Sequence, residues 1–312
     1  MIRFIPYRLA LKQPLCLPGI EPLRFREGLL VHRPDTGGWG DAAPLPGYSS
    51  ESLAELLEVV KSSNPDCAAF PSLRFALECA ERSFSAPEQS VKVNALWIVE
   101  KETLADLLLR LRDWPRPVIK VKPGASPQAS ALLELLAQRP DCRLRVDGNR
   151  QWSVEQTLQL YDQLPDEAVE YMEEPLADPD AYLRLWSRAD LPVALDECLL
   201  EPIGKELILF KGVKALILKP TLLGNASDRS YWIQKAGERN IKWVWSSCFE
   251  SGVGLWHIAR LAQKEAVAGL DTGGVFKQDL LSPRPLVFKG EVIPPKEREL
   301  HVFENGLIRF ED

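Results

Sequence analysis

The sequence predicts an α/β protein in which a modified (β/α)8 barrel of the TIM type follows a small N-terminal α+β capping domain. Three observations support this prediction. From about residue 90, short apolar segments recur at steps of 23 to 27 residues. Most gaps between them carry the apolar periodicity of amphipathic helices. Each segment ends in a polar or glycine residue, as do the strands that build the active face of a β/α barrel.

The N-terminal part of the chain has a different pattern. Alternation over 23–33 predicts a strand, and the Gly- and Pro-rich stretch 34–52 predicts turns and loop. Helical spacing follows over 52–61 and 73–83. Strands followed by helices are typical of a small α+β unit, so this region should form a domain of its own.

Eight apolar segments then alternate with helical patterns, which predicts a parallel sheet. The helical pattern after Leu199 is weaker and predicts only a short helix. No GxGxxG or Walker sequence follows a segment, so a nucleotide-binding open sheet is disfavoured, and the even spacing favours a closed barrel. The segments recur around Asn94, Val121, Asp147, Glu173, Asp196, Lys219, Trp245 and Asp271.

These patterns divide the chain into two domains. We expect the α+β capping domain at 1–90 and the catalytic β/α barrel at 91–285. The tail, 286–312, contains short strand-like pieces and should pack back on the capping domain. The loops 14–22 and 44–52 should close the mouth of the barrel and exclude water.

Composition excludes several classes of protein. The 312 residues are 46% hydrophobic and 26% charged, which is ordinary for a soluble globular protein and rules out general disorder. No uncharged apolar run reaches the roughly 20 residues of a membrane helix, and the N-terminus lacks the apolar core of a signal peptide. The net charge of −6 argues against nucleic acid as a partner. Six scattered cysteines indicate reduced thiols, so we expect a cytoplasmic protein.

The predicted strand ends carry an unusual set of charges. Three consecutive strands end in carboxylates, at Asp147, Glu173 and Asp196, and the strands on either side end in Lys122 and Lys219. Any one of these residues alone would be an ordinary solvated rim residue. Converging carboxylates repel one another unless a cation lies between them. Because the chain has only three histidines, we expect carboxylate ligands and a hard metal ion such as Mg²⁺.

Such a site can remove a proton next to a carboxylate. Period-2 alternation places Lys120 and Lys122 on one strand face, and Arg145, Asp147 and Asn149 on one face of the next strand. A lysine beside a divalent cation and a second ammonium gives up its proton more readily and can act as a general base. The cation holds the charge that develops on the substrate as an enediolate.

The motifs KVK, RVDGN, EEP, LDE and ILKP, in this order, resemble the enolase superfamily, in the muconate-lactonising subgroup with paired lysines. The mandelate-racemase subgroup would have a histidine after the seventh strand, where this chain has 245–248, WSSC. GWGDAAPLPGYSSES at 38–52, SSCFESGVGLWHIARLA at 246–262 and GLDTGG at 269–274 resemble the o-succinylbenzoate synthase family of menaquinone biosynthesis. Asp41 departs from that family's pattern, where Glu is commoner, as does Cys248 within the serine-rich turn.

The resemblance implies a lyase that removes water from 2-succinyl-6-hydroxy-2,4-cyclohexadiene-1-carboxylate by syn elimination, giving o-succinylbenzoate. Lys122 would be the base and then the acid, and Lys219 would stabilise the enediolate from the opposite face. Mg²⁺, for which Mn²⁺ can substitute, would be bound by Asp147, Glu173 and Asp196.

The resemblance also assigns supporting roles. The succinyl carboxylate would be held by Ser246, Ser247 and the backbone of Gly252. Lys120 and Asn149 would contact the metal ligands and the base without touching the substrate, and Arg145 would place a charge beside the substrate. Glu174 and Glu197 should turn outward into ion pairs.

Two other functions remain open from the sequence. An N-acylamino acid racemase or dipeptide epimerase would use the same site with both lysines as bases. A non-catalytic protein that binds small carboxylates would keep the barrel without the chemistry. The sequence does not report the oligomeric state.

Overall fold

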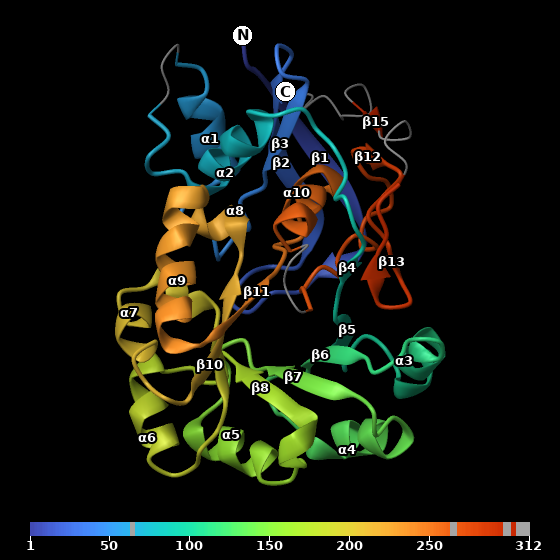
Figure 1. The fold of residues 1–312 in the computed structure, drawn as a ribbon, viewed down its shortest axis with the longest axis vertical. Coiled ribbons are helices and arrows are strands. Elements are labelled where there is room, and N and C mark those ends of the chain that lie inside the picture. Colours follow the sequence, from blue (N-terminus) through green and yellow to red (C-terminus); the bar gives the residue numbers. More distant parts are fainter. Residues whose placement is uncertain (63–65, 263–266, 296–300, 304–312) are drawn as a thin grey trace. The chain divides into compact units, whose positions relative to one another are not determined.

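The computed structural model describes residues 1–62, 66–262, 267–295 and 301–303 (Figure 1). The chain forms two compact units. The first unit comprises Met1–Val91, Leu218–Trp232 and Trp245–Asp312, and the second comprises Lys92–Ile217 and Ile233–Val244. The predicted domain boundaries at residues 90 and 285 stay a prediction.

A three-stranded antiparallel sheet begins the first unit. Its strands are β1 (Arg3–Leu15), β2 (Leu23–Arg33) and β3 (Gly38–Ala42), with β2 in the middle. Two helices follow, α1 (Leu53–Val59) and α2 (Pro71–Ala80). Residues of β2, β3, α1 and α2 share one apolar core, which includes Leu29, Leu56, Leu73 and Ala76.

Strand β3 lies within a stretch that the sequence assigned to loop, so that part of the prediction is wrong. Gly38 and Gly40 are the reason. A Cβ at Gly40 would lie 1.9 Å from the carbonyl oxygen of Ala76, and one at Gly38 would lie 2.0 Å from that of Ala80. The glycines that look like turn residues in the sequence instead let β3 pack directly on the backbone of α2.

Later parts of the chain complete the first unit. They contribute the short helix α8 (Pro220–Leu223), the start of α9 (Ala226–Arg239) and α10 (Gly252–Ala262). The remaining strands are short: β4 (Val91–Lys92), β12 (Leu281–Ser282), β13 (Val287–Phe288), β14 (Glu291–Val292) and β15 (His301–Val302). The described residues of the predicted tail 286–312 therefore belong to the first unit. Residues 296–300 and 304–312 of the tail lie outside the described residues.

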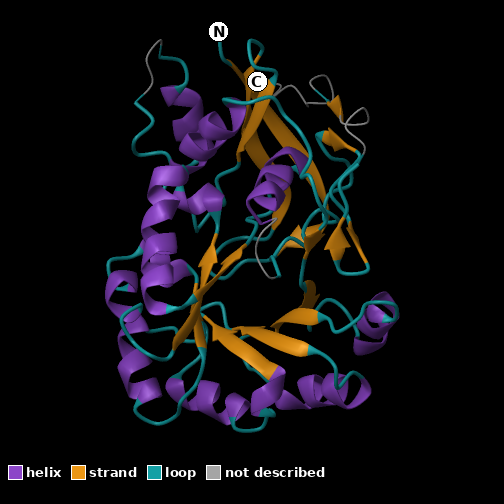
Figure 2. Cartoon of the chain, in the orientation of Figure 1, coloured by secondary structure: helices purple, strands orange, loops and turns teal. Residues whose placement is uncertain are grey.

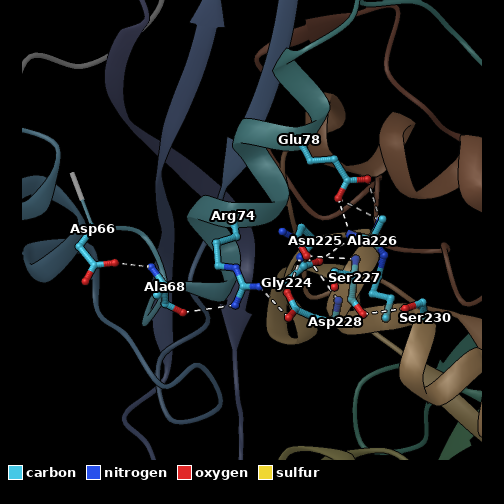
Figure 3. A network of polar contacts seen from close by, with 11 residues as sticks. Asp66, Ala68, Arg74, Glu78, Gly224, Asn225, Ala226, Ser227, Asp228 and Ser230 are labelled. Atoms are coloured by element: carbon cyan, nitrogen blue, oxygen red, sulfur yellow. Dashed lines mark hydrogen bonds and ion pairs between the residues drawn. The ribbon is translucent and has the colours of Figure 1, made fainter. Parts of the chain in front are cut away.

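Ion pairs join α2 to the start of α9 inside the first unit (Figure 3). Arg74 donates to Asp228 at 2.7 Å, and Glu78 pairs with Arg229 at 3.0 Å. Glu78 also accepts a hydrogen bond of 2.6 Å from the backbone N–H of Ala226. The carboxylate thus satisfies an N–H at the beginning of α9 that has no partner within the helix.

The second unit is built on a parallel sheet with the order β11-β10-β9-β8-β7-β6-β5. Figure 2 shows helices along one side of these strands, as in a β/α protein. The strands are β5 (Ala95–Ile98), β6 (Val118–Lys122), β7 (Arg143–Asp147), β8 (Val169–Glu173), β9 (Val193–Leu195), β10 (Val213–Leu218) and β11 (Lys242–Trp245). The helices are α3 (Leu104–Leu111), α4 (Ala129–Gln138), α5 (Val154–Tyr161), α6 (Tyr182–Trp186) and α7 (Gly204–Leu207), with 3-10 turns at Asp166–Ala168, Pro179–Ala181 and Glu197–Leu200.

Local sequence explains where these helices begin. Ser153 and Gln156 form a capping box at the start of α5, and Thr103 accepts the N–H of Asp106 at the start of α3. The weak pattern after Leu199 corresponds to α7, which has only four residues. In the described residues no helix is long and apolar enough to cross a membrane.

The prediction of a parallel β/α domain with an N-terminal capping domain is confirmed. Seven of the eight predicted barrel segments form strands of one sheet. The eighth, near Asp271, forms no strand within the described residues and is linked to the segment after β11 by a parallel bridge between Ser246 and Gly269. Its sequence, AGLDTGG, contains three glycines, which weaken a strand.

Candidate active site

Four neighbouring strands of the second unit bring the predicted charges to one edge of the sheet. Register pairs Lys120 of β6 with Arg145 of β7, and Asp147 of β7 with Glu173 of β8. Asp196 follows β9 directly. Because parallel strands end at the same edge, these side chains share the C-terminal side of the sheet, where β/α proteins carry their active sites.

Two lysines of β6 bind the carboxylates of the next strands. Lys120 Nζ lies 2.9 Å from Oδ2 of Asp147 and 2.6 Å from Oε1 of Glu173. Lys122 Nζ lies 3.1 Å from the same Asp147 oxygen and donates to Oδ1 of Asn149 at 2.9 Å. The alternation that placed both lysines on one face is therefore seen in their contacts.

The carboxylates are withdrawn from solvent. Asp147 is 3% exposed, Glu173 is 1% exposed, and Asp196 is also buried. A buried carboxylate is stable only beside a positive charge or several hydrogen-bond donors. Lys120, itself buried, supplies that charge to Asp147 and Glu173 in this structure.

The chemistry of these donors fits a hard divalent cation. All three are oxygen ligands at the ends of adjacent strands, and oxygen is what Mg²⁺ prefers. Among the described residues, no three His, Cys, Asp or Glu side chains lie close enough together to hold a metal ion by themselves. In this structure the Lys120 ammonium provides the positive charge beside Asp147 and Glu173.

Glu174 and Glu197 are both buried, so the prediction that they turn outward is wrong. The predicted ion pair is present for Glu174, whose Oε2 lies 3.8 Å from Nε of Arg150. Glu174 has a positive φ of 36° and accepts the N–H groups of Asp196 at 2.8 Å and Cys198 at 2.9 Å. Burial raises the pKa of Glu174 to about 7. The sequence EEP gave no signal for this, because the turn after β8 decides where the second carboxylate points.

Asn149 and Arg145 support the site in different ways. Asn149, which has a φ of 44°, donates its backbone N–H to Oδ1 of Asp147 while its side chain accepts from Lys122. Arg145 is buried, pairs with Glu170 at 2.8 Å and donates to Asn94 at 3.2 Å. These contacts give Arg145 partners within the second unit, and its role beside a substrate stays a prediction.

The remaining predicted residues belong to the first unit. Lys219 precedes Pro220 at the start of α8. Ser246 and Ser247 follow β11 and bind the segment around Gly269: Ser247 N donates to Gly269 O at 3.1 Å, and its hydroxyl lies 2.7 Å from that of Thr272.

Gly252 begins helix α10 and donates its N–H to Asp279 at 2.7 Å. The predicted contact between this N–H and a substrate carboxylate would require that bond to break. The contact was implied by the resemblance to o-succinylbenzoate synthases, and nothing near Gly252 in the sequence indicated that Asp279, 27 residues later, would bind it.

Sequence reasoning missed Arg26, which is buried in the middle strand of the first sheet. Alternation places it on the same strand face as Gly28 and Leu30. An arginine on the strand face that also carries Leu30, an apolar residue, was the feature of the sequence that could have indicated a buried charge. Its guanidinium donates hydrogen bonds to backbone carbonyls of the segment 246–251.

Two known protein families match this sequence, one in its N-terminal part and one in its C-terminal part. Residues 2–84 match the family described as MenC, N-terminal domain, and residues 109–296 match that described as enolase C-terminal domain-like. The o-succinylbenzoate synthase of Enterobacter sp. (strain 638) is 32% identical over 285 residues, covering 84% of this chain and 88% of the relative. This chain belongs to the o-succinylbenzoate synthase family. The family consists of hydro-lyases of menaquinone biosynthesis within the enolase superfamily, as the motifs had indicated.

Solved structures agree on the fold. The o-succinylbenzoate synthase from Thermosynechococcus elongatus BP-1, complexed with Mg in the active site, superposes with a TM-score of 0.69 at 20% identity and covers 92% of this chain and 95% of that one. The N-succinyl Arg/Lys racemase from Bacillus cereus ATCC 14579 gives 0.79 at 14% identity, with 97% and 95% covered. Racemases and synthases of the superfamily thus share this fold, and fold similarity does not separate them.

Proposed function

We propose that this member of the family dehydrates 2-succinyl-6-hydroxy-2,4-cyclohexadiene-1-carboxylate to o-succinylbenzoate, with Lys122 as the acid–base residue. The observation that carries the proposal is the position of Lys122, whose Nζ lies 3.1 Å from Asp147 and 2.9 Å from Asn149 at the carboxyl end of β6. The sequence relationship to o-succinylbenzoate synthases supports the choice of substrate.

Lys122 acts twice in this reaction. As the neutral amine it takes the proton from the ring carbon that bears the carboxylate, and the electrons of that C–H bond go toward the carboxylate. The C–O bond on the same face then breaks, and Lys122 returns the proton so that hydroxide leaves as water. The ring becomes aromatic, and Lys122 ends as the neutral amine with which it began. Asn149 holds Nζ in position by accepting its hydrogen bond.

Mg²⁺, or Mn²⁺ in its place, would supply the positive charge that stabilises the substrate carboxylate while the proton is removed. Asp147, Glu173 and Asp196 are the residues that would hold it, since they are buried carboxylates ending adjacent strands. Lys120 balances two of these charges, and Glu174 fixes the backbone that carries Asp196.

The remaining roles follow the sequence prediction. Lys219 would be a fixed positive charge on the opposite face of the substrate. Ser246, Ser247 and Gly252 would hold the succinyl carboxylate, Arg145 would add a charge beside the ring, and the loops 14–22 and 44–52 would exclude water. A cytoplasmic location is part of the proposal, and it is supported by the six cysteines, none of which is joined to another in a disulfide.

A turnover assay with the cyclohexadiene substrate and Mg²⁺ tests the proposal. Formation of the aromatic ring is followed by ultraviolet absorbance. The same preparation is given N-acylamino acids and dipeptides in deuterium oxide, where a racemase or epimerase exchanges the α-proton. Faster turnover of those compounds than of the cyclohexadiene would assign the chain to racemisation, and no turnover of either would leave carboxylate binding as its function.

A further inference from the structure

Arg26 is a buried arginine whose hydrogen bonds all go to backbone carbonyls of two loops. Its side chain is 2% exposed. It donates to Pro44 O at 2.9 Å and Ala43 O at 2.9 Å, at the start of the loop 44–52. It also donates to Phe249 O at 3.1 Å and Cys248 O at 3.3 Å, in the loop after β11. One guanidinium thus links two loops more than 200 positions apart in the sequence.

Asp41 holds the same loop from its other end. Its carboxylate is 1% exposed and accepts both the backbone N–H of Ser251 at 2.9 Å and the Ser251 hydroxyl at 2.7 Å. The other carboxylate oxygen accepts the Tyr7 hydroxyl at 2.8 Å, so strand β1 anchors it. Asp41 itself has no role in the proposed reaction.

The loop between these anchors has little freedom to move. Glu250 is buried and accepts the Cys248 N–H at 2.7 Å and the Thr221 hydroxyl at 2.5 Å. Phe249 has a φ of 60°, a conformation that a bulky residue keeps only when its surroundings impose it. A Cβ at Gly254 would lie 2.7 Å from Cβ of Glu250 and 3.0 Å from Oδ2 of Asp41, so glycine is needed for this close packing.

We propose that Arg26 and Asp41 are positioning residues that fix the loop 246–251, and that through it they set the affinity for the substrate's succinyl carboxylate. The inference rests on the proposed function, in which Ser246 and Ser247 contact that carboxylate. Arg26 and Asp41 act on binding and not on proton transfer, because their contacts are with the loop backbone and Ser251. Ordering a loop when a ligand binds costs conformational entropy. A loop that is already ordered in the free protein avoids this entropy loss, so the substrate binds more tightly.

The test compares Asp41→Ala with Asp41→Asn. Alanine leaves the buried Ser251 N–H without an acceptor. Asparagine can turn its oxygen to Ser251 and its amide nitrogen to the Tyr7 hydroxyl, which also accepts hydrogen bonds. We expect Asp41→Ala to raise KM about tenfold with kcat within about threefold, and Asp41→Asn to restore most of the loss.

Arg26→Lys is the second variant, in case Asp41→Ala does not fold. It keeps the charge but loses the planar fork that reaches both loops. We expect the same rise in KM. Glu78→Ala is the matched control, because Glu78 also accepts a backbone N–H and a second donor in this unit, but joins α2 to α9 (Figure 3). That control should lose thermal stability with KM unchanged.

Cys248 provides a readout that does not depend on activity. It is 1% exposed and lies inside the loop, whereas Cys142, also buried, lies in the second unit. Alkylation mapped by mass spectrometry should accelerate at Cys248 relative to Cys142 in Asp41→Ala and Arg26→Lys, and not in Glu78→Ala. Unchanged KM together with unchanged labelling of Cys248 would overturn the inference.

The two proposals fail separately. A wild-type protein that does not dehydrate the cyclohexadiene refutes the proposed function, and the labelling of Cys248 still tests whether Arg26 and Asp41 hold the loop. A wild-type protein that turns over normally, with variants that lower kcat and leave KM unchanged, refutes the positioning of the carboxylate site alone.

Discussion

The ammonium nitrogen of Lys122 and Oδ2 of Asp147 lie 3.1 Å apart, and the nitrogen of Lys120 lies 2.9 Å from the same oxygen. The residue proposed as the base therefore shares a partner with a residue proposed to bind the metal. Removing Asp147 would change both functions at once, because it alters the charge next to Lys122 and the oxygen donors of the metal site. Experiments that separate the two functions need residues that touch only one of them.

Lys122 is the residue whose replacement tests the base. Lys122→Ala should lower kcat by at least about a thousandfold, since the group that moves the proton is gone. Lys122→Arg should be nearly as inactive, because a guanidinium stays protonated at working pH. The absorbance assay for o-succinylbenzoate measures both. A Lys122→Arg enzyme with more than a few per cent of wild-type kcat contradicts the assignment.

Lys219 should behave differently, because a syn elimination needs one acid–base residue. Lys219→Ala should lower kcat strongly through loss of a fixed charge, and Lys219→Arg should keep part of the activity because the charge is displaced but present. Turnover of both variants is compared with wild type. If Lys219→Ala dehydrates the substrate at the wild-type rate, the electrostatic role is refuted.

Asp196 tests the metal site at a carboxylate other than Asp147 and Glu173, the two that form ion pairs with the lysines of β6. Activity should need Mg²⁺ or Mn²⁺ and disappear in excess chelator. Asp196→Asn should weaken Mg²⁺ binding in calorimetry by about tenfold or more and remove activity, with the unfolding midpoint nearly unchanged, because a converging like charge is relieved. Full activity of the wild type in chelator is the result that contradicts this prediction.

The sequence predicted most of this arrangement because periodicity and strand ends are local signals. Strand β2 has the predicted bounds, and Lys120 and Lys122 both contact Asp147, as alternation on their strand requires. Lys120 also contacts Glu173, which the sequence placed at the end of the next strand. What failed depended on contacts distant in sequence or on one backbone angle. Strand β3 needs the backbone of α2 to explain its glycines, and a positive φ turns Glu174 inward.

Gly40 gives a direct test of how β3 packs on α2. Gly40→Ala should lower the free energy of unfolding by about 3 kcal/mol or more, because a Cβ there meets the Ala76 carbonyl at 1.9 Å and neither backbone can yield without separating strand from helix. Gly237→Ala is the matched control, since Gly237 lies in α9 with nothing within 4 Å of its added Cβ. It should raise stability by about 0.5–1 kcal/mol. Urea unfolding measures both, and equal effects of the two substitutions would refute the packing argument.

His257 should make stability depend on pH. It is buried, its Nε2 donates to Trp39 O at 2.7 Å, and burial lowers its pKa from 6.5 to about 4. Since the folded-state pKa lies below the unfolded one, the unfolded chain takes up the proton first as pH falls. The contribution of neutral His257 to the free energy of unfolding is therefore fully present above pH 6.5 and is lost as the pH falls toward 4. The free energy of unfolding should fall by about 2 kcal/mol between pH 7 and pH 5 for this reason. His257→Gln retains an N–H donor and cannot titrate, so urea unfolding should show a smaller loss over that interval than wild type. A loss as large as that of the wild type would mean that other groups cause the pH dependence.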